Sequence, residues 1–197
     1  MTATTAMREA MPTGVFGANA TAAGLWELTE QLVVPGEYAE QFRAVVDETP
    51  VHEIPTALLP SDLQHTGYQL LVKDEGRMRG GAYKLRGMVS ALLPHVGKSH
   101  HVVAGSTGNH AKEGAVAVEA MGFESFTAYC PEDASLAKLY GIARHGGRII
   151  LTPDLPQALS AAEAAGRQPG HVFVHPYNMP PVVAGQGTAT LELADQL

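Results

Sequence analysis

A lysine follows a glycine-rich turn in the string Gly80-Gly81-Ala82-Tyr83-Lys84. A positive side chain in the first turn of a helix faces the positive end of the helix dipole. That potential, together with partial burial, favours the neutral and nucleophilic form of an amine. Lys84 is therefore a candidate for amine chemistry, although most lysines at such positions are merely solvated.

A second segment, residues 104–110 (AGSTGNH), combines two glycines with short polar side chains. Glycine allows a tight turn, and Ser106, Thr107 and Asn109 bring hydroxyl and amide groups to it. The free N–H groups of a helix that begins here would attract an anion such as a carboxylate or a phosphate. The segment matches neither a P-loop nor a dinucleotide-binding fingerprint. The alternative interpretation is a capped turn, in which Ser106 or Asn109 is only the N-cap.

Short apolar runs alternate with helix-length connections from about residue 68 onward. This alternation predicts an α/β fold with an open, twisted, mostly parallel sheet and helices on both faces. In such sheets ligands bind outside the carboxyl ends of the strands, where both segments above are expected. The run over 68–74 is expected to be a buried strand. The predicted strands are 68–74, 100–106, 126–130, 148–153 and 171–176, and the predicted helices are 22–34, 37–46, 83–93, 110–121, 136–145, 156–167 and 181–197.

The composition argues against several classes of function. Twenty acidic residues against 13 Lys and Arg give a formal net charge of -7, which offers no basic face to nucleic acid. No run approaches the roughly 18 apolar residues of a membrane span. The cysteine and the histidines lack the spacing of a metal site, so we expect no bound metal. A cytoplasmic protein that acts on a small molecule is the resulting prediction.

Other conspicuous side chains are interpreted as structural. His100 and His101 are expected at a strand edge, and Trp26 on the packing face of a helix. Cys130 is expected to be a small buried residue, because no histidine stands at a spacing that suggests a paired nucleophile. Lys138 is expected to be solvated, with the minor alternative that it lines the entrance to the site.

Four strings resemble consecutive motifs of threonine dehydratases, within the tryptophan-synthase-β (fold type II) family of pyridoxal-phosphate enzymes. They are GGAYKLRG, AGSTGNHAKEGAVAVEAMG, CPEDASLAKLYGIARHGGRIIL and FVHPYNMPPVVAGQGTATLEL, and the resemblance extends from Thr49 to the C-terminus. It implies that residues 21–84 begin a large domain, that 85–180 form a complete small domain, and that 181–197 start the return to the large domain. Residues 1–20 are expected to be loose.

The resemblance also assigns roles to individual residues. Lys84 stands where the family binds pyridoxal phosphate covalently, in a motif where Ala82 and Tyr83 replace the usual Ser and Phe. Tyr83 can still pack its ring on the cofactor, and Asn109 matches the asparagine that hydrogen-bonds the hydroxyl of the cofactor ring. His110 is expected to shape its loop rather than to transfer a proton. The substrate carboxylate is expected at Ser106, Thr107, Gly108, Asn109 and His110, and a supporting turn and helix start at Gly185, Gln186, Gly187 and Thr188.

The implied reaction is β-elimination from threonine or serine, which gives a 2-oxo acid and ammonia. Lys84 would first anchor the cofactor and then remove the Cα proton of the amino-acid substrate, while the cofactor ring takes up the electrons. A threonine synthase is the enzymatic alternative, because KDEG and STGN also occur in that branch. A homo-oligomer is the expected assembly.

The resemblance also implies an incomplete large domain. The family's phosphate-binding loop, and the residue that contacts the pyridine nitrogen, would follow Leu197. The isolated chain is therefore expected to hold the cofactor weakly, because a phosphate cradle supplies several charge-assisted hydrogen bonds. Three interpretations stay open: a truncated product, one piece of a split enzyme completed by a C-terminal polypeptide, or a domain without catalysis.

Overall fold

A computed structural model describes residue 34 and residues 36–99 and 101–197 of the chain. The expected loose segment 1–20, Trp26 with nearly all of the helix predicted over 22–34, and His100 lie outside these residues. In the described part of the chain, no helix is long and apolar enough to cross a membrane.

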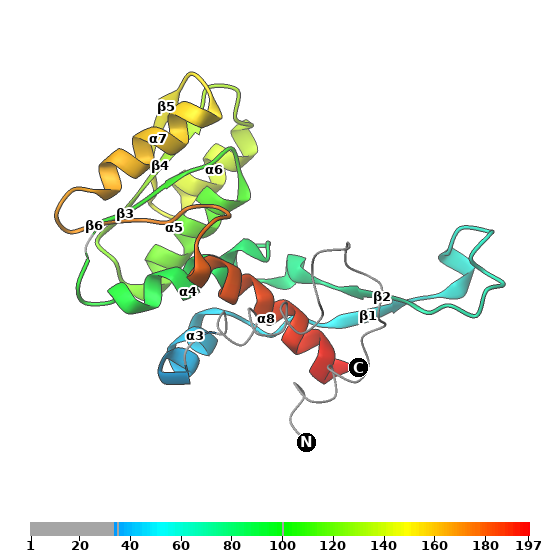
Figure 1. Cartoon of the computed structure of the whole chain (residues 1–197). Coiled ribbons are helices and arrows are strands. Elements are labelled where there is room, and N and C mark those ends of the chain that lie inside the picture. Colours follow the sequence, from blue (N-terminus) through cyan, green and yellow to red (C-terminus); the bar gives the residue numbers. More distant parts are fainter. Residues whose placement is uncertain (1–33, 35, 100) are drawn as a thin grey trace, which may run out of the picture.

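A four-stranded parallel sheet lies toward one end of the molecule, at the upper left of Figure 1. Its strands are β3 (His101–Gly105), β4 (Ser125–Pro131), β5 (Arg148–Thr152) and β6 (His171–Phe173), in the spatial order β5-β4-β3-β6. The chain moves outward from β3 to β4 and β5, and then returns across the sheet to place β6 beside β3. The direction of winding therefore reverses at β3, which is where ligand sites form in sheets of this kind. The predicted α/β class is confirmed.

Helices cover both faces of this sheet. They are α5 (Asn109–Met121), α6 (Leu136–Arg144) and α7 (Leu155–Gly166). The ring of Phe126 in β4 fills the space beside Gly114, so α5 lies on the face of Phe126. Gly105 in β3 points the opposite way, because side chains alternate along paired strands, and it meets the backbone of Ala158. α7 therefore covers the other face, whereas α6 packs against α5 and β5.

Local sequence signals set the ends of these helices. The Asp154 carboxylate caps α7 by accepting a hydrogen bond from the Gln157 N–H at 2.8 Å, and a proline occupies the first turn. Gly122 ends α5 in the left-handed conformation, with φ of 73°, where a β-carbon would be strained. The observed bounds of all three helices lie within one residue of the predicted ones.

An antiparallel hairpin projects away from the parallel sheet (Figure 1). It consists of β1 (Val51–Ile54) and β2 (Leu70–Lys73). The prediction that the run over 68–74 is a buried strand is wrong, because Leu70, Leu71 and Val72 are 46%, 38% and 41% exposed. An apolar run signals burial only where another layer packs on it, and a two-stranded ribbon provides no such layer by itself. β1 was not predicted, since its four residues include a histidine and a glutamate.

Two helices connect the hairpin region to the sheet. They are α4 (Lys84–Leu92) and α8 (Pro180–Gln196), which pack against each other, while α3 (Ala39–Val45) packs on α4 and α5. Short 3₁₀ turns occupy Gly36–Tyr38, Thr56–Leu58, Glu75–Arg77 and Leu93–His95. The three helices predicted here are confirmed, with ends shifted by at most two residues.

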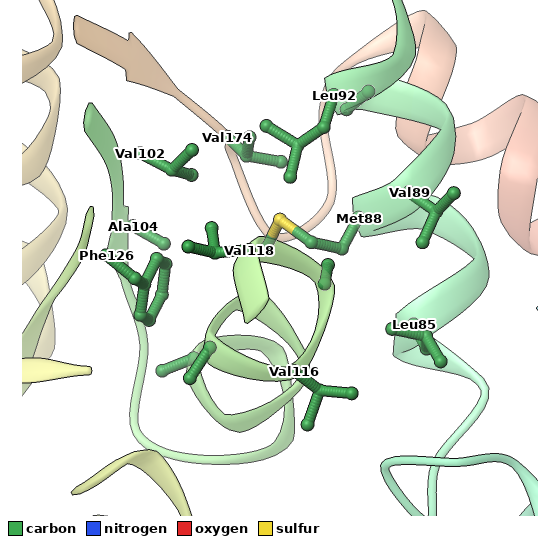
Figure 2. Close-up of a cluster of buried hydrophobic side chains, with 14 of the residues drawn as sticks. Leu85, Met88, Val89, Leu92, Val102, Ala104, Val116, Val118, Phe126 and Val174 are labelled. Atoms are coloured by element: carbon green, nitrogen blue, oxygen red, sulfur yellow. The ribbon is translucent and has the colours of Figure 1, made fainter. Parts of the chain in front are cut away.

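A hydrophobic core fixes α4 against α5 and the sheet. In Figure 2, Val118 of α5 lies between two groups of side chains. Val102 and Phe126 of the strands are on one side, and Met88 of α4 is on the other. Leu85, Met88, Val89 and Leu92 of α4 are all fully buried. Each such side chain contributes about 1.5–3 kcal/mol relative to exposure to water. The helix that begins at Lys84 is therefore held firmly beside the helix that follows the Ser106 loop.

Candidate active site

The segments expected to carry chemistry meet at the β3 and β6 edge of the sheet. β3 ends at Gly105, and residues 106–108 lead directly into α5. Beyond β6, the Val174 N–H donates to the Val103 carbonyl at 3.0 Å, so the chain continues beside β3. Lys84 approaches from α4 and reaches this same segment at Pro176. The Ser106 loop follows a strand of the parallel sheet as expected, whereas the Lys84 segment follows β2 of the separate hairpin and reaches the end of β6 only through its side chain.

The amine of Lys84 is held by the segment that follows β6. Nζ donates a hydrogen bond to the Pro176 carbonyl at 3.0 Å and lies 4.6 Å from the centre of the Tyr177 ring. The centre of the Tyr83 ring lies 5.3 Å from Nζ. A carbonyl oxygen and two ring faces are partners that attract an ammonium group. Pro176 and Tyr177 are site residues that sequence reasoning missed.

His175 shapes the turn that contacts Lys84. Its Nδ1 accepts hydrogen bonds from the N–H groups of Tyr177 at 3.1 Å and Asn178 at 2.9 Å. The side chain therefore satisfies two backbone donors in a turn that has no regular secondary structure. A signal for this turn was present in the sequence, because proline and asparagine directly after a strand are typical turn residues.

The loop before α5 is closed by its own serine. Ser106 Oγ accepts a hydrogen bond from the Gly108 N–H at 3.1 Å, and the Ser106 N–H donates to the Tyr129 carbonyl at 3.0 Å. Gly108 occupies the N-cap position, and none of the described side chains caps the helix. The capped-turn alternative is therefore not observed. Within the described ranges, the first N–H groups of α5 have no side-chain acceptor, while Thr107 and Asn109 are exposed.

Lys138 lies across this loop. A β-carbon placed on Gly108 would come within 2.6 Å of Lys138 Nζ and 2.8 Å of its Cδ. The side chain is exposed, as predicted for a solvated lysine, but its charge stands beside the start of α5. This position corresponds to the minor alternative, in which Lys138 lines the entrance to the site.

His110 is buried next to the loop and is neutral at physiological pH. Burial is the main cause that lowers the pKa of the imidazole to about 4, with smaller electrostatic contributions in the same direction from Lys84 and His175. Nε2 lies 3.0 Å from the Val174 carbonyl, which can only accept, so this nitrogen carries the proton. Nδ1 is then a buried acceptor, and none of the described groups donates a hydrogen bond to it.

The segment 185–188 lies within α8, not in a turn at a helix start as expected. A β-carbon on Gly185 would overlap the carbonyl oxygen of Arg86, so this glycine lets α8 touch α4. Thr188 Oγ1 accepts a hydrogen bond from Arg86 Nη1 at 3.0 Å. The supporting side chains therefore act on α4, the helix that begins at Lys84.

Arg86 forms the centre of a buried ionic network behind Lys84. Its guanidinium donates to both carboxylate oxygens of Glu75, at 2.7 and 2.9 Å, and to both of Glu192, at 2.6 and 2.8 Å. Lys73 Nζ donates to Glu192 at 2.9 Å and to the Thr49 carbonyl at 2.7 Å. The two cations and two anions bring together the hairpin, α4 and α8, three elements from distant parts of the sequence.

The pKa values within this network reflect its pairing. Burial opposes the charge of Arg86, but the hydrogen bonds to Glu192 and Glu75 outweigh it and raise the pKa of the guanidinium. Burial likewise opposes ionisation of Glu192, but the hydrogen bonds from Arg86 and Lys73 outweigh it and lower the pKa of that carboxyl. Arg86 was not among the expected site residues. An arginine within the apolar stripe of a helix was the available signal.

No group of three or more His, Cys, Asp or Glu side chains within the described ranges could hold a metal ion. Cys130 is buried, as expected, and burial raises the pKa of its thiol to about 11. A thiol with this pKa is a poor nucleophile at neutral pH. Lys84 is therefore the better candidate for covalent chemistry.

The chain is similar to L-threonine ammonia-lyase of Thermotoga maritima, with 36% identity over 135 residues that cover 67% of this chain and 33% of the relative. It is 32% identical to serine racemase of Oryza sativa subsp. indica over 150 residues, which cover 75% of this chain and 44% of the relative. The chain thus spans about a third to a half of the length of the curated relatives it matches.

The processed form of threonine deaminase isoform 2 from Solanum lycopersicum has a similar structure, with a TM-score of 0.70 and 22% identity over 90% of this chain and 47% of that one. This match shows the fold and confirms the fold type II class. The family described as pyridoxal-phosphate dependent enzyme matches residues 48–197, about three quarters of the chain. These findings confirm the resemblance seen in the motifs, and the chain belongs to the family of pyridoxal-phosphate dependent enzymes.

Proposed function

We propose that this chain binds pyridoxal phosphate through Lys84 and serves the β-elimination of serine or threonine to a 2-oxo acid and ammonia. The observation that carries the proposal is the contact of Lys84 with the segment after β6, beside the loop that opens α5. An amine and an anion-attracting helix start therefore meet at the edge of the sheet where the winding reverses.

The residues present fit the cofactor. Lys84 offers a half-buried primary amine near the rings of Tyr83 and Tyr177, which could pack on an aromatic ligand. The exposed amide of Asn109 is available to a ring hydroxyl, and Nδ1 of His110 is a buried acceptor still without a donor among the described groups. The cofactor, when bound, takes up the electrons left when a proton departs from the substrate Cα.

The protein's own share is binding and proton transfer. The N–H groups at the start of α5 and the hydroxyl of Thr107 would bind the substrate carboxylate, and Lys138 adds a positive charge beside Gly108. A carboxylate fixed there would hold the Cα–H bond toward Lys84, whose amine accepts the proton. His110 is not expected to transfer a proton to the substrate, because its pKa of about 4 keeps the imidazole neutral.

The assembly and the domain limits are part of the same proposal. We propose residues 85–180 as the small domain, with 21–84 and 181–197 belonging to a larger one. Since the chain spans only about a third to a half of the length of the relatives it matches, we propose a complementing C-terminal polypeptide as a partner that would supply the phosphate site. The exposed apolar side of β2 is a surface available to it or to a second copy. A cytoplasmic location stays a prediction.

Cofactor affinity tests the proposal. We expect Lys84→Ala to weaken the binding of pyridoxal phosphate at least tenfold, measured by the change in its visible absorbance on titration. The matched control is Lys98→Ala, at an exposed lysine outside the site, and it should bind as the natural chain does. Equal affinity of the natural chain and Lys84→Ala would contradict the proposal.

Product release then separates the candidate reactions. With the cofactor and serine or threonine, ammonia and a 2-oxo acid should appear, either with the chain alone or after its complementing polypeptide is added. Inversion of serine without ammonia would indicate racemisation instead, which is the activity named for one relative. Binding without either product, in the presence of that polypeptide, would favour the catalytically silent domain.

A further inference from the structure

Glu113 is a buried carboxyl group that the proposed reaction does not use. The residue, in the second turn of α5, is 0% exposed. None of the described groups donates a hydrogen bond to either carboxyl oxygen. Lys112 Nζ forms an ion pair with Oε1 at 3.3 Å, although outside the geometry that a hydrogen bond requires, and this pair does not offset the effect of burial. A charged carboxylate is strongly disfavoured in such a place, so the neutral acid is the form that suits it.

This carboxyl group packs against the turn that leads to Lys84. A β-carbon on Gly80 would overlap Oε2 of Glu113, so the carboxyl group touches the backbone there. The next residue, Gly81, has a φ of 81° and donates a hydrogen bond to the Met78 carbonyl at 2.6 Å. Lys112 Nζ is 3.6 Å from the position of a β-carbon on Gly81. The glycine turn therefore rests directly on two side chains of α5.

The charges around Glu113 do not stabilise its ionised form enough to offset burial. Burial raises the pKa of the carboxyl to about 7, while Lys112 on its own helix and His145 after α6 act in the opposite direction. His145 is itself paired with Glu119, with 2.6 Å between Nδ1 and Oε2. The turn contributes the backbone of Gly80, which has no side chain and no charge. The protonation state of Glu113 therefore changes in a range where the protein is expected to work.

We propose that Glu113 is a positioning residue for Lys84: as a neutral acid it supports the turn at Gly80 and Gly81, and loss of its proton to solvent loosens that turn. The loosened turn withdraws Lys84 from Pro176 and Tyr177. The helix α5 thereby contacts both parts of the site. It begins at the anion-attracting loop, and it carries Glu113 against the turn at Gly80 and Gly81 that leads to Lys84. The functional meaning rests on the role proposed for Lys84, but the movement can be measured without any cofactor.

Hydrogen exchange of backbone amides gives the first test. The amides of Gly81, Leu85 and Arg86 donate hydrogen bonds within or next to the turn, so their protection factors report its opening. Opening frees Glu113 to regain its ordinary pKa of 4.5, so the open fraction should rise roughly tenfold per pH unit between 4.5 and about 7. Glu113→Gln, which is permanently neutral, should remove this pH dependence.

A surface variant serves as the control for this experiment. Glu163→Gln changes an exposed carboxylate that pairs with Arg167 on α7, and it should leave the pH dependence at Gly81 unchanged. Protection at Gly81 that is independent of pH in the natural chain, or equally dependent on pH in Glu113→Gln, would overturn the proposal.

The reactivity of the lysine itself separates positioning from general stability. Lys84 and the exposed Lys98 can be acetylated slowly with a small reagent, and the ratio of the two rates can be read by peptide mass spectrometry. At pH 8 we expect a ratio several-fold higher in the natural chain than in Glu113→Gln, because Lys84 has left its partners. Near pH 4 the two ratios should agree, because Glu113 is then protonated in both the closed and the open turn. Equal ratios at both pH values would contradict positioning of Lys84, even if the cofactor binds as proposed.

Discussion

On the α8 side of Lys84, the charge of Arg86 is buried among two carboxylates, whereas on the α5 side Glu113 is buried without a hydrogen-bond donor among the described groups. Both regions touch the same short piece of chain, since Arg86 lies two residues after Lys84 and Gly80 four residues before it. One end of this piece is therefore fixed by a fully paired ionic network, while the other end rests on a carboxyl group that can respond to pH.

The two regions should therefore respond to pH in opposite directions. The pKa of Glu192 is lowered in the folded chain, so its contribution to stability is present above the unfolded pKa and is lost on acidification. The pKa of Glu113 is raised, so the folded chain binds an extra proton and stability falls as the pH rises. Substitution of Arg86 removes the first of these regions, and substitution of Glu113 removes the second.

The largest effect is expected from Arg86→Met, which keeps most of the side-chain volume and removes the charge. Glu75 and Glu192 would be left without their main partner, and breaking a buried pair in this way costs about 3–5 kcal/mol of unfolding free energy. Urea unfolding measures the loss. Arg167→Met is the control, because its exposed pair with Glu163 should contribute at most about 0.5 kcal/mol. Similar losses of unfolding free energy in Arg86→Met and Arg167→Met would show that the buried network stabilises the fold no more than an exposed ion pair does.

A smaller effect is expected from pH acting on Glu113. The pKa rises from 4.5 to about 7 on folding, so the natural chain should lose about 3 kcal/mol of unfolding free energy across that interval. Below 4.5 both states bind the proton and the slope from this group vanishes. Glu113→Gln should flatten this part of the profile and should be more stable than the natural chain above about pH 7. A natural chain whose stability is flat or rising over the interval would contradict the assignment.

The closeness of α4 and α8 can be tested with a pair of glycines on α8. Gly185→Ala places a methyl group into the Arg86 carbonyl and should cost about 1–3 kcal/mol, because the two helices must move apart. A β-carbon on Gly187 would have no neighbour within 4 Å among the described residues, so Gly187→Ala should instead stabilise the helix by up to about 1 kcal/mol. Thermal unfolding of the two variants should therefore shift in opposite directions. Shifts of the same sign would mean that α8 does not pack here as described.

The parallel part of the fold could be predicted because each element has its own local signal. α5, α6 and α7 show helical periodicity, and a glycine or a capping carboxylate sets two of their ends, at Gly122 and Asp154. β1 and the exposure of β2 could not be predicted in this way. An apolar strand of four residues has the same local pattern whether or not another layer covers it.

The site was predictable only where a residue type signals chemistry by itself. Lys84 and the loop at Ser106 stood out because of the glycines and polar groups around them. Arg86 and Glu113 did not, because their significance depends on which partners are near them in space. The contact of Pro176 with Lys84 joins residues 92 positions apart through a backbone carbonyl. Every residue has such a carbonyl, so the sequence contains no signal for this contact.

The most direct test of the account is the site at which the cofactor becomes attached. The purified chain should be mixed with pyridoxal phosphate, reduced with borohydride and digested, and the modified lysine should be identified by mass spectrometry. Reduction traps even a weakly held cofactor, so high affinity is not required for the measurement. If Lys84 is the lysine that binds the cofactor, it should be modified in clear excess over Lys73, Lys98, Lys112 and Lys138. Modification spread evenly over the five lysines would contradict this assignment.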